Sequence, residues 1–464
     1  MNDKITVVIL AAGLGTRMKS KKAKVLHEAG GDTLLNNIIR AVRQVASAHN
    51  IVAVIGHQAD RVKESVHEPG IRFALQDEQR GTGHAVMCAA AAITEREGQL
   101  LILNGDGPLL RPQTLRRLLD QQESPGSGGK IVTTRLHDPT GYGRIVRGGG
   151  GYVEAIVEQK AANAEQLAIH EVNPGLYCFD ARLFWEHVQE IRPDNPANEF
   201  YLTDMVGILS RHGYPIAPVL VHDSTELLGI NTKAELALAD SILRARKAQE
   251  LMLAGVTIEN PGSVLIDVDV HVGADTVIEA NVQLRGKTTI GVDCRIGVGS
   301  VLRDCAVGDD VNILPYVVAD SSVIGTKSSV GPFTRMRMNA ETGEDSHIGN
   351  FVELKKTKFG AGSKASHLAY LGDSIIGEKV NIGAGTITCN YDGDKKHTTH
   401  IADGVFVGSN STLVAPLTIE SGAFIAAGSV ITKRVSQDAL AIGRAHQTEK
   451  ADWAKRRRDL NKKK

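Results

Sequence analysis

The stretch LIDVDVHVGADTVIEANVQLRGKTTIGVDCRIGVGSVL, residues 265–302, has an aliphatic residue at every sixth position. These positions are Ile266, Val272, Ile278, Leu284, Ile290, Ile296 and Leu302, and the same spacing returns at Ile401, Val407, Leu413, Ile419, Ile425 and Ile431. A six-residue aliphatic period is a signature of a parallel β-helix. Each side of such a coil contributes one inward residue, and three sides make one coil. The C-terminal half is therefore predicted to be a solenoid.

Two further features of this half bear on its corners and its chemistry. A glycine often follows the aliphatic residue, as in Ile290-Gly291, and we expect these glycines to form tight corners with unusual backbone angles.

Between the two regular tracts the period is kept only in part. Regular coils do not need Lys355, His367 or Asn390, so we expect chemistry in this interrupted region.

The N-terminal half has a different pattern. From Lys4 to about Ile230, aliphatic runs such as KITVVIL, NIVAVIG and QLLILNGD alternate with helical segments such as TLLNNIIRAVRQVA. This alternation predicts an α/β fold with a mostly parallel sheet covered by helices. Ligands in such folds bind beyond the C-terminal ends of the strands.

A single long helix is predicted between the two halves. Thr232 and Glu235 form a capping box, and the roughly 22 residues that follow would span about 33 Å as a helix. We expect it to end at Gly255. The predicted organisation is thus an α/β domain over residues 1–230, a linker helix over 231–255, and a β-helix domain over 256–464. The last domain carries a basic C-terminal tail that we expect to be solvated.

Composition excludes several classes of protein. Among the 464 residues, Lys plus Arg equal Asp plus Glu at 53 each, which argues against a nucleic-acid partner. No window approaches about 18 apolar residues and no signal peptide precedes the first strand, so we expect a soluble, cytoplasmic protein without membrane insertion. The five cysteines lack CxxC spacing, and we expect them to be reduced and mostly buried: Cys88, Cys178, Cys294, Cys305 and Cys389.

The loop LAAGLGTRMKSKKAK, residues 10–24, directly follows the first strand. It lacks the full dinucleotide fingerprint and the GKS or GKT of a P-loop. Its position, together with Arg17 and Lys24, favours a nucleoside triphosphate, although an ordinary turn with exposed basic residues is the alternative. Asn104-Gly105-Asp106 closes the strand QLLIL, and Asp106 is placed either to hold Mg²⁺ between phosphate oxygens or to cap the next turn.

A series of motifs covers nearly the whole chain in one order. They are LAAGLGTRM, QDEQRGTGHAV, NGDGPL, PTGYGRIVR, IVEQK and EVNPG, followed by SKASHLAYLGD and NIGAGTITCNYDG. Together they resemble the bacterial bifunctional UDP-N-acetylglucosamine pyrophosphorylase / glucosamine-1-phosphate N-acetyltransferase family. The resemblance implies an α/β nucleotidyltransferase of Rossmann-like type joined to a left-handed β-helix. It also implies a homotrimer whose acetyl-transfer sites lie between subunits.

The same resemblance implies two reactions. Acetyl-CoA acetylates glucosamine 1-phosphate, and UTP then reacts with N-acetylglucosamine 1-phosphate to give UDP-N-acetylglucosamine and pyrophosphate, with Mg²⁺ as cofactor. The product is a precursor of peptidoglycan and lipopolysaccharide. Two alternatives stay open from the residues: a nucleotidyltransferase whose β-helix is only regulatory or oligomerising, and a scaffold with a degenerate nucleotidyltransferase domain.

The resemblance assigns residues to the uridylyl-transfer site. The nucleotide would contact Leu10, Ala11, Ala12, Gly13, Arg17 and Lys24, and its uracil Gln76, Gly81 and Thr82. The sugar would contact Gly141, Glu158 and Asn173, and the metal would be held by Asp106 and Asn231. The chain departs from the family pattern at Leu14, Ala23 and Asn104, where lysine, proline and tyrosine are frequent.

A second set is assigned to acetyl transfer. His367 matches the general base, a task that suits imidazole because it titrates near neutral pH. The acceptor would be held by Arg337, Lys355, Tyr370, Asn381 and Asn390, and acetyl-CoA by Ala384, Asn390, Tyr391, Ser409, Ala427 and Arg444. Here the chain reads RMRMN, residues 335–339, where the family commonly has RLRPG.

Overall fold

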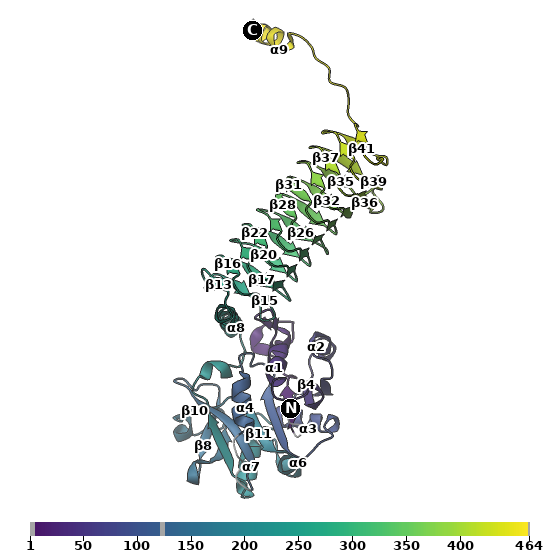
Figure 1. The fold of residues 1–464 in the computed structure, drawn as a ribbon. Coiled ribbons are helices and arrows are strands. Elements are labelled where there is room, and N and C mark those ends of the chain that lie inside the picture. Colours follow the sequence, from purple (N-terminus) through teal and green to yellow (C-terminus); the bar gives the residue numbers. More distant parts are fainter. Residues whose placement is uncertain (1–4, 121–125, 463–464) are drawn as a thin grey trace. The chain divides into compact units, whose positions relative to one another are not determined.

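The computed structural model describes residues 5–120 and 126–462, and these divide into two units, Met1–Arg246 and Lys247–Lys464. Figure 1 labels their helices and strands. The helices are α1 (Leu34–Val42), α2 (Ala59–Ser65), α3 (Thr82–Ala89), α4 (Pro112–Asp120), α5 (Ala164–Leu167), α6 (Ala181–His187), α7 (Asp204–Arg211), α8 (Lys233–Leu253) and α9 (Trp453–Asn461).

The first unit is built on a ten-stranded sheet. Its strands are β1 (Ile5–Leu10), β4 (Ile51–Ile55), β5 (Arg72–Leu75), β6 (Gln99–Asn104), β7 (Gly129–Arg135), β8 (Gly143–Arg147), β9 (Val153–Val157), β10 (Glu171–Asn173), β11 (Leu176–Asp180) and β12 (Ile216–Leu220). Their order is β10-β8-β9-β12-β7-β11-β6-β1-β4-β5. Strands β2 (Glu28–Ala29) and β3 (Asp32–Thr33) form a separate two-stranded sheet that does not pair with the ten-stranded one.

The α/β fold class predicted from the sequence is confirmed, and the sheet is mixed. Strands β6, β1, β4 and β5 run parallel, whereas β11 runs antiparallel to both β6 and β7. Successive residues of β1 enter opposite cores, because Val7 and Ile9 belong to one apolar cluster and Val8 to another. Burial on both faces explains why the strand reads as a continuous apolar run rather than as an alternation.

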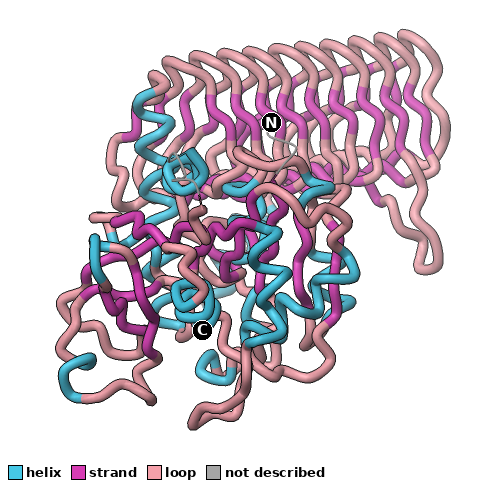
Figure 2. The backbone as a smooth tube through the Cα atoms, turned by 90° about the horizontal axis from the view of Figure 1, so that it is seen from below, coloured by secondary structure: helices cyan, strands magenta, loops and turns pink. Residues whose placement is uncertain are grey.

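The second unit consists of three parallel sheets that the chain visits in turn, as Figure 2 shows for the stacked coils. The first sheet contains β13 (Thr257–Ile258), β16 (Val277–Ile278), β19 (Arg295–Ile296), β22 (Asn312–Ile313), β25 (Ser329–Val330), β28 (His347–Asn350), β31 (Lys364–His367), β34 (Asn381–Ile382), β37 (Phe406–Val407), β40 (Phe424–Ile425) and β42 (Leu440–Ala441). The second contains β14 (Leu265–Ile266), β17 (Gln283–Arg285), β20 (Val301–Arg303), β23 (Val318–Asp320), β26 (Arg335–Arg337), β29 (Glu353–Lys355), β32 (Tyr370–Gly372), β35 (Ile387–Cys389), β38 (Thr412–Val414) and β41 (Val430–Ile431). The third contains β15 (His271–Val272), β18 (Thr289–Ile290), β21 (Ala306–Val307), β24 (Val323–Ile324), β27 (Glu341–Thr342), β30 (Lys358–Phe359), β33 (Ser374–Ile376), β36 (Thr399–Ile401) and β39 (Leu417–Ile419).

The aliphatic residues of the six-residue period form the core of this solenoid. Ile266, Ile278, Leu284, Ile296 and Leu302 are fully buried. Parallel pairing stacks each on its equivalent in the next coil, so that Ile266 lies against Leu284 and Leu284 against Leu302. The predicted β-helix of hexapeptide repeats is thus confirmed, and three parallel sheets of short strands are consistent with the left-handed form.

The predicted reason for the glycines at the corners is wrong. Gly273 and Gly291 do not have positive φ angles; that conformation is taken instead by residues such as Asp275 and Asp293. A Cβ at Gly273 would lie 2.6 Å from the backbone carbon of Gly291 in the next coil. These glycines are therefore required by the close approach of neighbouring coils, and in their two turns Asp275 and Asp293 take the left-handed conformation.

Other elements follow the sequence closely. The capping box is present, because the Glu235 N–H donates to Thr232 Oγ1 at 3.2 Å and the Thr232 N–H to Glu235 Oε2 at 2.8 Å. Gly255, just beyond α8, has a φ of +96°. All five cysteines are free thiols, and Cys178, Cys294 and Cys305 are buried. Of the helices in the described part of the chain, none is long and apolar enough to cross a membrane.

Candidate functional site

One candidate site lies beyond the carboxyl ends of β1 and β6, where ligands of α/β sheets bind. The Lys24 ammonium contacts the carboxylate of Asp106 and lies 3.1 Å from Oδ1 of Asn231. The Arg17 guanidinium donates to the same Asn231 oxygen at 2.9 Å. The structure thus brings two cations and two oxygen donors, separated by up to 214 positions in the sequence, to one point.

The loop from Leu10 to Gly13 leaves β1 at this edge. Ala11 and Ala12 are buried, and the Ala11 N–H donates to the carbonyl of Val54 at 2.8 Å. Gly13 is exposed, and a Cβ there would meet open space. The exposed backbone from Gly13 onward is therefore the part of the loop that a phosphate can approach.

The departures from the family pattern have local explanations. Ala23 donates its N–H to Gln58 Oε1 at 3.1 Å, a hydrogen bond that proline cannot make. The Asn104 side chain fills the space beside Gly175, where a Cβ would lie only 2.2 Å from Nδ2. Leu14 is 51% exposed and adds an apolar side chain to the loop where the family often has a cation.

The residues assigned to the uracil are also neighbours. Gln76 is buried, and its side-chain amide donates to the carbonyl of Gly81 at 3.1 Å. Gly81 has a φ of +106°, and a Cβ there would lie 2.5 Å from the Phe200 carbonyl, so only glycine fits. Thr82 begins α3, and its hydroxyl accepts from the Leu202 N–H at 3.0 Å.

Two of the residues assigned to the sugar are linked through Tyr177. Asn173 is buried and donates to the Tyr177 hydroxyl at 2.6 Å, and the charge of Glu158 acts on the same tyrosine. Burial raises the pKa of Glu158 above its ordinary value, while the Thr203 hydroxyl, which donates to it at 3.3 Å, opposes that rise. A carboxylate held in this way is an acceptor for hydroxyl groups.

The glycine next to this carboxylate is Gly143 and not Gly141. Gly141 is exposed, a Cβ there would meet open space, and its N–H donates to the side chain of Gln159. A Cβ at Gly143 would lie 2.9 Å from the Ile156 side chain and 3.5 Å from Glu158 Oε1. The resemblance assigns Gly141 to the sugar, and its exposed backbone leaves that assignment a prediction.

In the β-helix, a buried ion pair organises a cluster of cations. The Lys355 ammonium donates to Asp373 Oδ2 at 2.6 Å, with the lysine side chain only 3% exposed, and the buried Asn390 amide donates to the same carboxylate. Burial alone would raise the pKa of Asp373, but hydrogen bonds from Lys355 and Asn390 hold it below its ordinary value. The nearby Lys355 ammonium lowers the pKa of Lys396, to which Arg337 also contributes. Arg337 is also paired with Glu353, so three cations and two carboxylates leave this cluster with an excess of one positive charge.

His367 ends β31 and is exposed at a corner of the β-helix. Its Nδ1 donates to Asn350 Oδ1 in the preceding coil at 3.3 Å. The tautomer that makes this contact carries its proton on Nδ1, and in that tautomer the lone pair of Nε2 is available.

The residues assigned to acetyl-CoA continue along the same corner. Backbone hydrogen bonds of 2.7–2.9 Å connect the equivalent corners of four coils, at residues 367–368, 384–385, 409–410 and 427–428. The Arg444 guanidinium then contacts the carbonyl of Ala427. His367, Ala384, Ser409, Ala427 and Arg444 therefore form one edge, called here the acetyl edge.

The cation cluster consists of Arg337, Lys355, Asp373, Asn390 and Lys396. Along the chain, the acetyl edge and this cluster lie on opposite sides of strand β32. His367 precedes β32, whereas Asp373 follows it. Tyr370 begins this strand and reaches toward the cluster, since a Cβ at Gly372 would lie 2.5 Å from its hydroxyl and 2.8 Å from Asn390 Nδ2. Asn381 begins β34 on the neighbouring sheet, and Tyr391 is 59% exposed in the loop after β35. Within the described part of the chain, the structure shows no hydrogen bond or ion pair between His367 and the cation cluster.

Comparisons with known proteins place both units in families. Residues 7–198 match the MobA-like NTP transferase domain, and residues 260–359 match the GMPPB C-terminal domain. The chain is 53% identical over 462 residues to the bifunctional protein GlmU of Solibacter usitatus, covering 100% of this chain and 99% of that protein. The chain belongs to the bifunctional GlmU family. The GlmU proteins of Koribacter versatilis (47% over 466 residues; 100% and 99% covered) and Anaeromyxobacter sp. (48% over 459 residues; 98% and 93% covered) are also similar.

Family membership confirms the predicted resemblance and a bifunctional enzyme with a nucleotidyltransferase domain. Membership is also consistent with a requirement for a divalent metal. The GMPPB domain match ends at residue 359, before His367, whereas the GlmU match runs through the whole acetyl edge.

Sequence reasoning missed several residues that the structure brings into these sites: Asn350, Asp373, Lys396, Gly143 and Thr203. Asp373 ends the motif HLAYLGD and Gly143 belongs to PTGYG, so a motif signal was present for both. Asn350 is found only from the stacking of coils, and Lys396 only from the path of the loop between β35 and β36.

Proposed function

We propose that this chain acetylates glucosamine 1-phosphate with acetyl-CoA at the β-helix and then transfers the uridylyl group of UTP to the product at the α/β unit. The observation that carries the proposal is the presence of two separate cation clusters. One surrounds Asp106 and Asn231, and the other surrounds the Lys355–Asp373 pair. Both reactions have phosphorylated substrates, and each cluster supplies the positive charge that such a substrate requires.

In uridylyl transfer the sugar phosphate oxygen attacks the α-phosphorus of UTP, and pyrophosphate leaves from the opposite side. No protein nucleophile is needed, so the chain's task is to position two polyanions. Arg17 and Lys24 would neutralise phosphate charge, Gln76 would read the uracil, and Glu158 would accept from sugar hydroxyls.

The donor set at this site suits Mg²⁺. The oxygens of Asp106 and Asn231 converge on one cationic group, the Lys24 ammonium, and hard divalent cations take carboxylate and amide oxygens as ligands. When bound, Mg²⁺ would supply charge neutralisation to the triphosphate. Lys24 would then be free to contact phosphate oxygens instead of Asp106.

In acetyl transfer the amine of glucosamine 1-phosphate attacks the thioester carbonyl and the CoA thiolate leaves. Nε2 of His367 would take the proton that the amine loses, because Asn350 holds the other ring nitrogen as a donor. Arg337, Lys355 and Lys396 would bind the phosphate. The resemblance implies a homotrimer with acetyl-transfer sites between neighbouring subunits, and we propose this assembly for the present chain.

An omission assay tests this function. Purified protein is supplied with glucosamine 1-phosphate, acetyl-CoA, UTP and Mg²⁺, with one component left out at a time, while free CoA and pyrophosphate are measured separately. We expect CoA release to need only the first two, and pyrophosphate release to need all four unless N-acetylglucosamine 1-phosphate is added. With N-acetylglucosamine 1-phosphate added, pyrophosphate release without any CoA release from glucosamine 1-phosphate would instead favour a regulatory β-helix, and release of neither product would favour a scaffold.

A further inference from the structure

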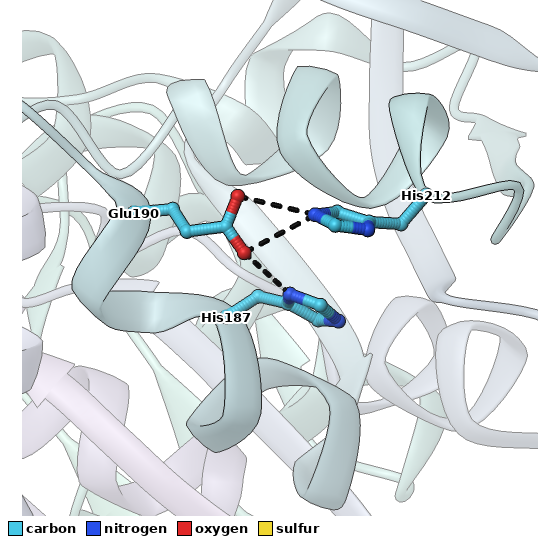
Figure 3. Close-up of side chains that lie close together, drawn as sticks. All are labelled: His187, Glu190 and His212. Carbon is cyan, nitrogen blue, oxygen red and sulfur yellow. Dashed lines mark hydrogen bonds and ion pairs between the residues drawn. The ribbon is translucent and has the colours of Figure 1, made fainter.

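Two histidines and one glutamate lie close together in the first unit. The helices that carry them contain none of the residues assigned above to substrates or metal. His187 ends α6, Glu190 ends the short 3-10 helix that follows it (Val188–Glu190), and His212 is the C-cap residue of α7. Figure 3 shows both rings turned toward the carboxylate. His187 Nδ1 lies 2.6 Å from Glu190 Oε1, and His212 Nε2 lies 3.1 Å from both oxygens of Glu190.

The arrangement has the composition of a metal site. One ligand atom from each residue lies within 4.8 Å of the other two, and the centroids of the two rings are 4.1 Å apart. Metal–ligand bonds of about 2.0–2.1 Å in a tetrahedral site place ligand atoms about 3.3 Å apart. The two nitrogen–oxygen separations of 2.6 and 3.1 Å reach that value with sub-ångström movements, and the ligand nitrogens of the two rings lie within 4.8 Å of each other.

The surroundings provide both support and access. The His187 side chain is only 10% exposed and is thus held by packing, whereas Glu190 and His212 are each 44% exposed. Glu190 also lines a cavity of about 310 Å³, together with Arg192, Asp204 and Arg211. An ion can therefore reach the carboxylate from solvent and keep water as a further ligand.

We propose that His187, Glu190 and His212 form a binding site for a borderline divalent transition metal such as Zn²⁺. Two imidazole nitrogens favour such a metal over Mg²⁺, which prefers an all-oxygen set like that of Asp106 and Asn231. The bound ion would tie the end of α6 to the end of α7. The alternative is an ion pair in which Glu190 accepts from both rings, and this would have no affinity for metals.

The test uses the full chain, freed of metal with a chelator and kept in excess Mg²⁺ so that oxygen-rich sites are filled. Zn²⁺ is titrated by calorimetry and Co²⁺ by absorption. We expect one saturable site per chain, with the d–d bands of a nitrogen and oxygen ligand set. A thiolate charge-transfer band would instead place the ion at a cysteine such as Cys88, which lies beside His84, and would overturn the proposal.

Three variants complete the test. Glu190→Gln and His212→Gln each remove one ligand at an exposed position, and each should lower Zn²⁺ affinity by at least roughly 100-fold, more than the usual effect of changing a residue behind a ligand. His222→Gln changes another exposed histidine of the same unit and should bind as the wild type does. Unchanged affinity in Glu190→Gln, or equal loss in all three variants, would leave only adventitious binding. Thermal unfolding without metal verifies that each variant is folded. If His212→Gln is unfolded, the Zn²⁺ affinity of Glu190→Gln, which keeps the shape of the side chain, decides the test.

Discussion

Replacement of Asp373 by Asn tests whether the cation cluster of the β-helix depends on one buried charge. The Lys355 ammonium is 3% exposed and lies 2.6 Å from the Asp373 carboxylate. Asn keeps the shape of the side chain but removes the counter-ion, so a buried ammonium is left uncompensated. Breaking a buried ion pair in this way costs about 3–5 kcal/mol. For a unit of this size the midpoint of thermal unfolding should fall by roughly 6–20 °C.

Calorimetry of the full chain measures this effect, provided that the two units unfold in separate transitions. Addition of UTP with Mg²⁺ should raise only the transition of the α/β unit, which identifies the other as that of the β-helix. The matched control is Glu353→Gln, which breaks the Arg337–Glu353 pair, 2.7 Å long and with both side chains 32% exposed. Solvent-screened pairs contribute about 0–1 kcal/mol, so the control should barely move the β-helix transition.

The pH dependence gives the same reasoning a second test. The folded-state pKa of Asp373 is held below its ordinary value, so its stabilisation is present above the unfolded value of about 3.9 and is lost as the pH falls through the folded value. Wild type and Asp373→Asn should therefore differ at neutral pH and converge in acid. Equal transitions for the two proteins at neutral pH would refute the view that the Lys355 charge needs this partner.

Three further predictions concern activity. Asp106→Ala should abolish Mg²⁺-dependent release of pyrophosphate and spare CoA release; a normal rate of pyrophosphate release would remove Asp106 from the metal site. His367→Ala should slow CoA release by about 10²–10⁴-fold, the usual share of a general base, while uridylyl transfer continues; equal loss of both activities would mean a structural role. Thr203→Val removes a hydrogen bond that lowers the pKa of Glu158, so the acid limb of the pH profile of uridylyl transfer should move to higher pH, and an unmoved limb would show that Glu158 does not set it.

Much of the fold was readable because its signals are periodic and local. The six-residue period selects the buried positions of each coil, and the apolar run of β1 indicates a strand covered on both faces. The capping box of Thr232 and Glu235 lies within four residues, and the structure contains it. Local hydrogen bonds and side-chain periodicity are properties of short segments, which is why these predictions were correct.

The reasons behind some patterns were not readable. Gly273 and Gly291 lie in the turns after β15 and β18, but the approach of the next coil, a contact across 18 residues of sequence, requires them rather than a positive φ. Gly141 and Gly143 stand two positions apart in one motif, yet only the second lies against Glu158. Sequence alone does not say which backbone atom another segment will approach.

The sequence by itself determined a six-residue solenoid, an α/β unit before it, and the residue types expected of two phosphate-binding sites. Only the tertiary structure decided that Lys24, Asp106 and Asn231 meet at one point. It also decided that Asp373 neutralises Lys355, whereas His367 lies on the other side of β32 along the chain. The physical reason is the range of the interactions. Periodicity and capping act over a few residues, whereas charge pairing and coil stacking join side chains whose distance is set only once the chain has folded.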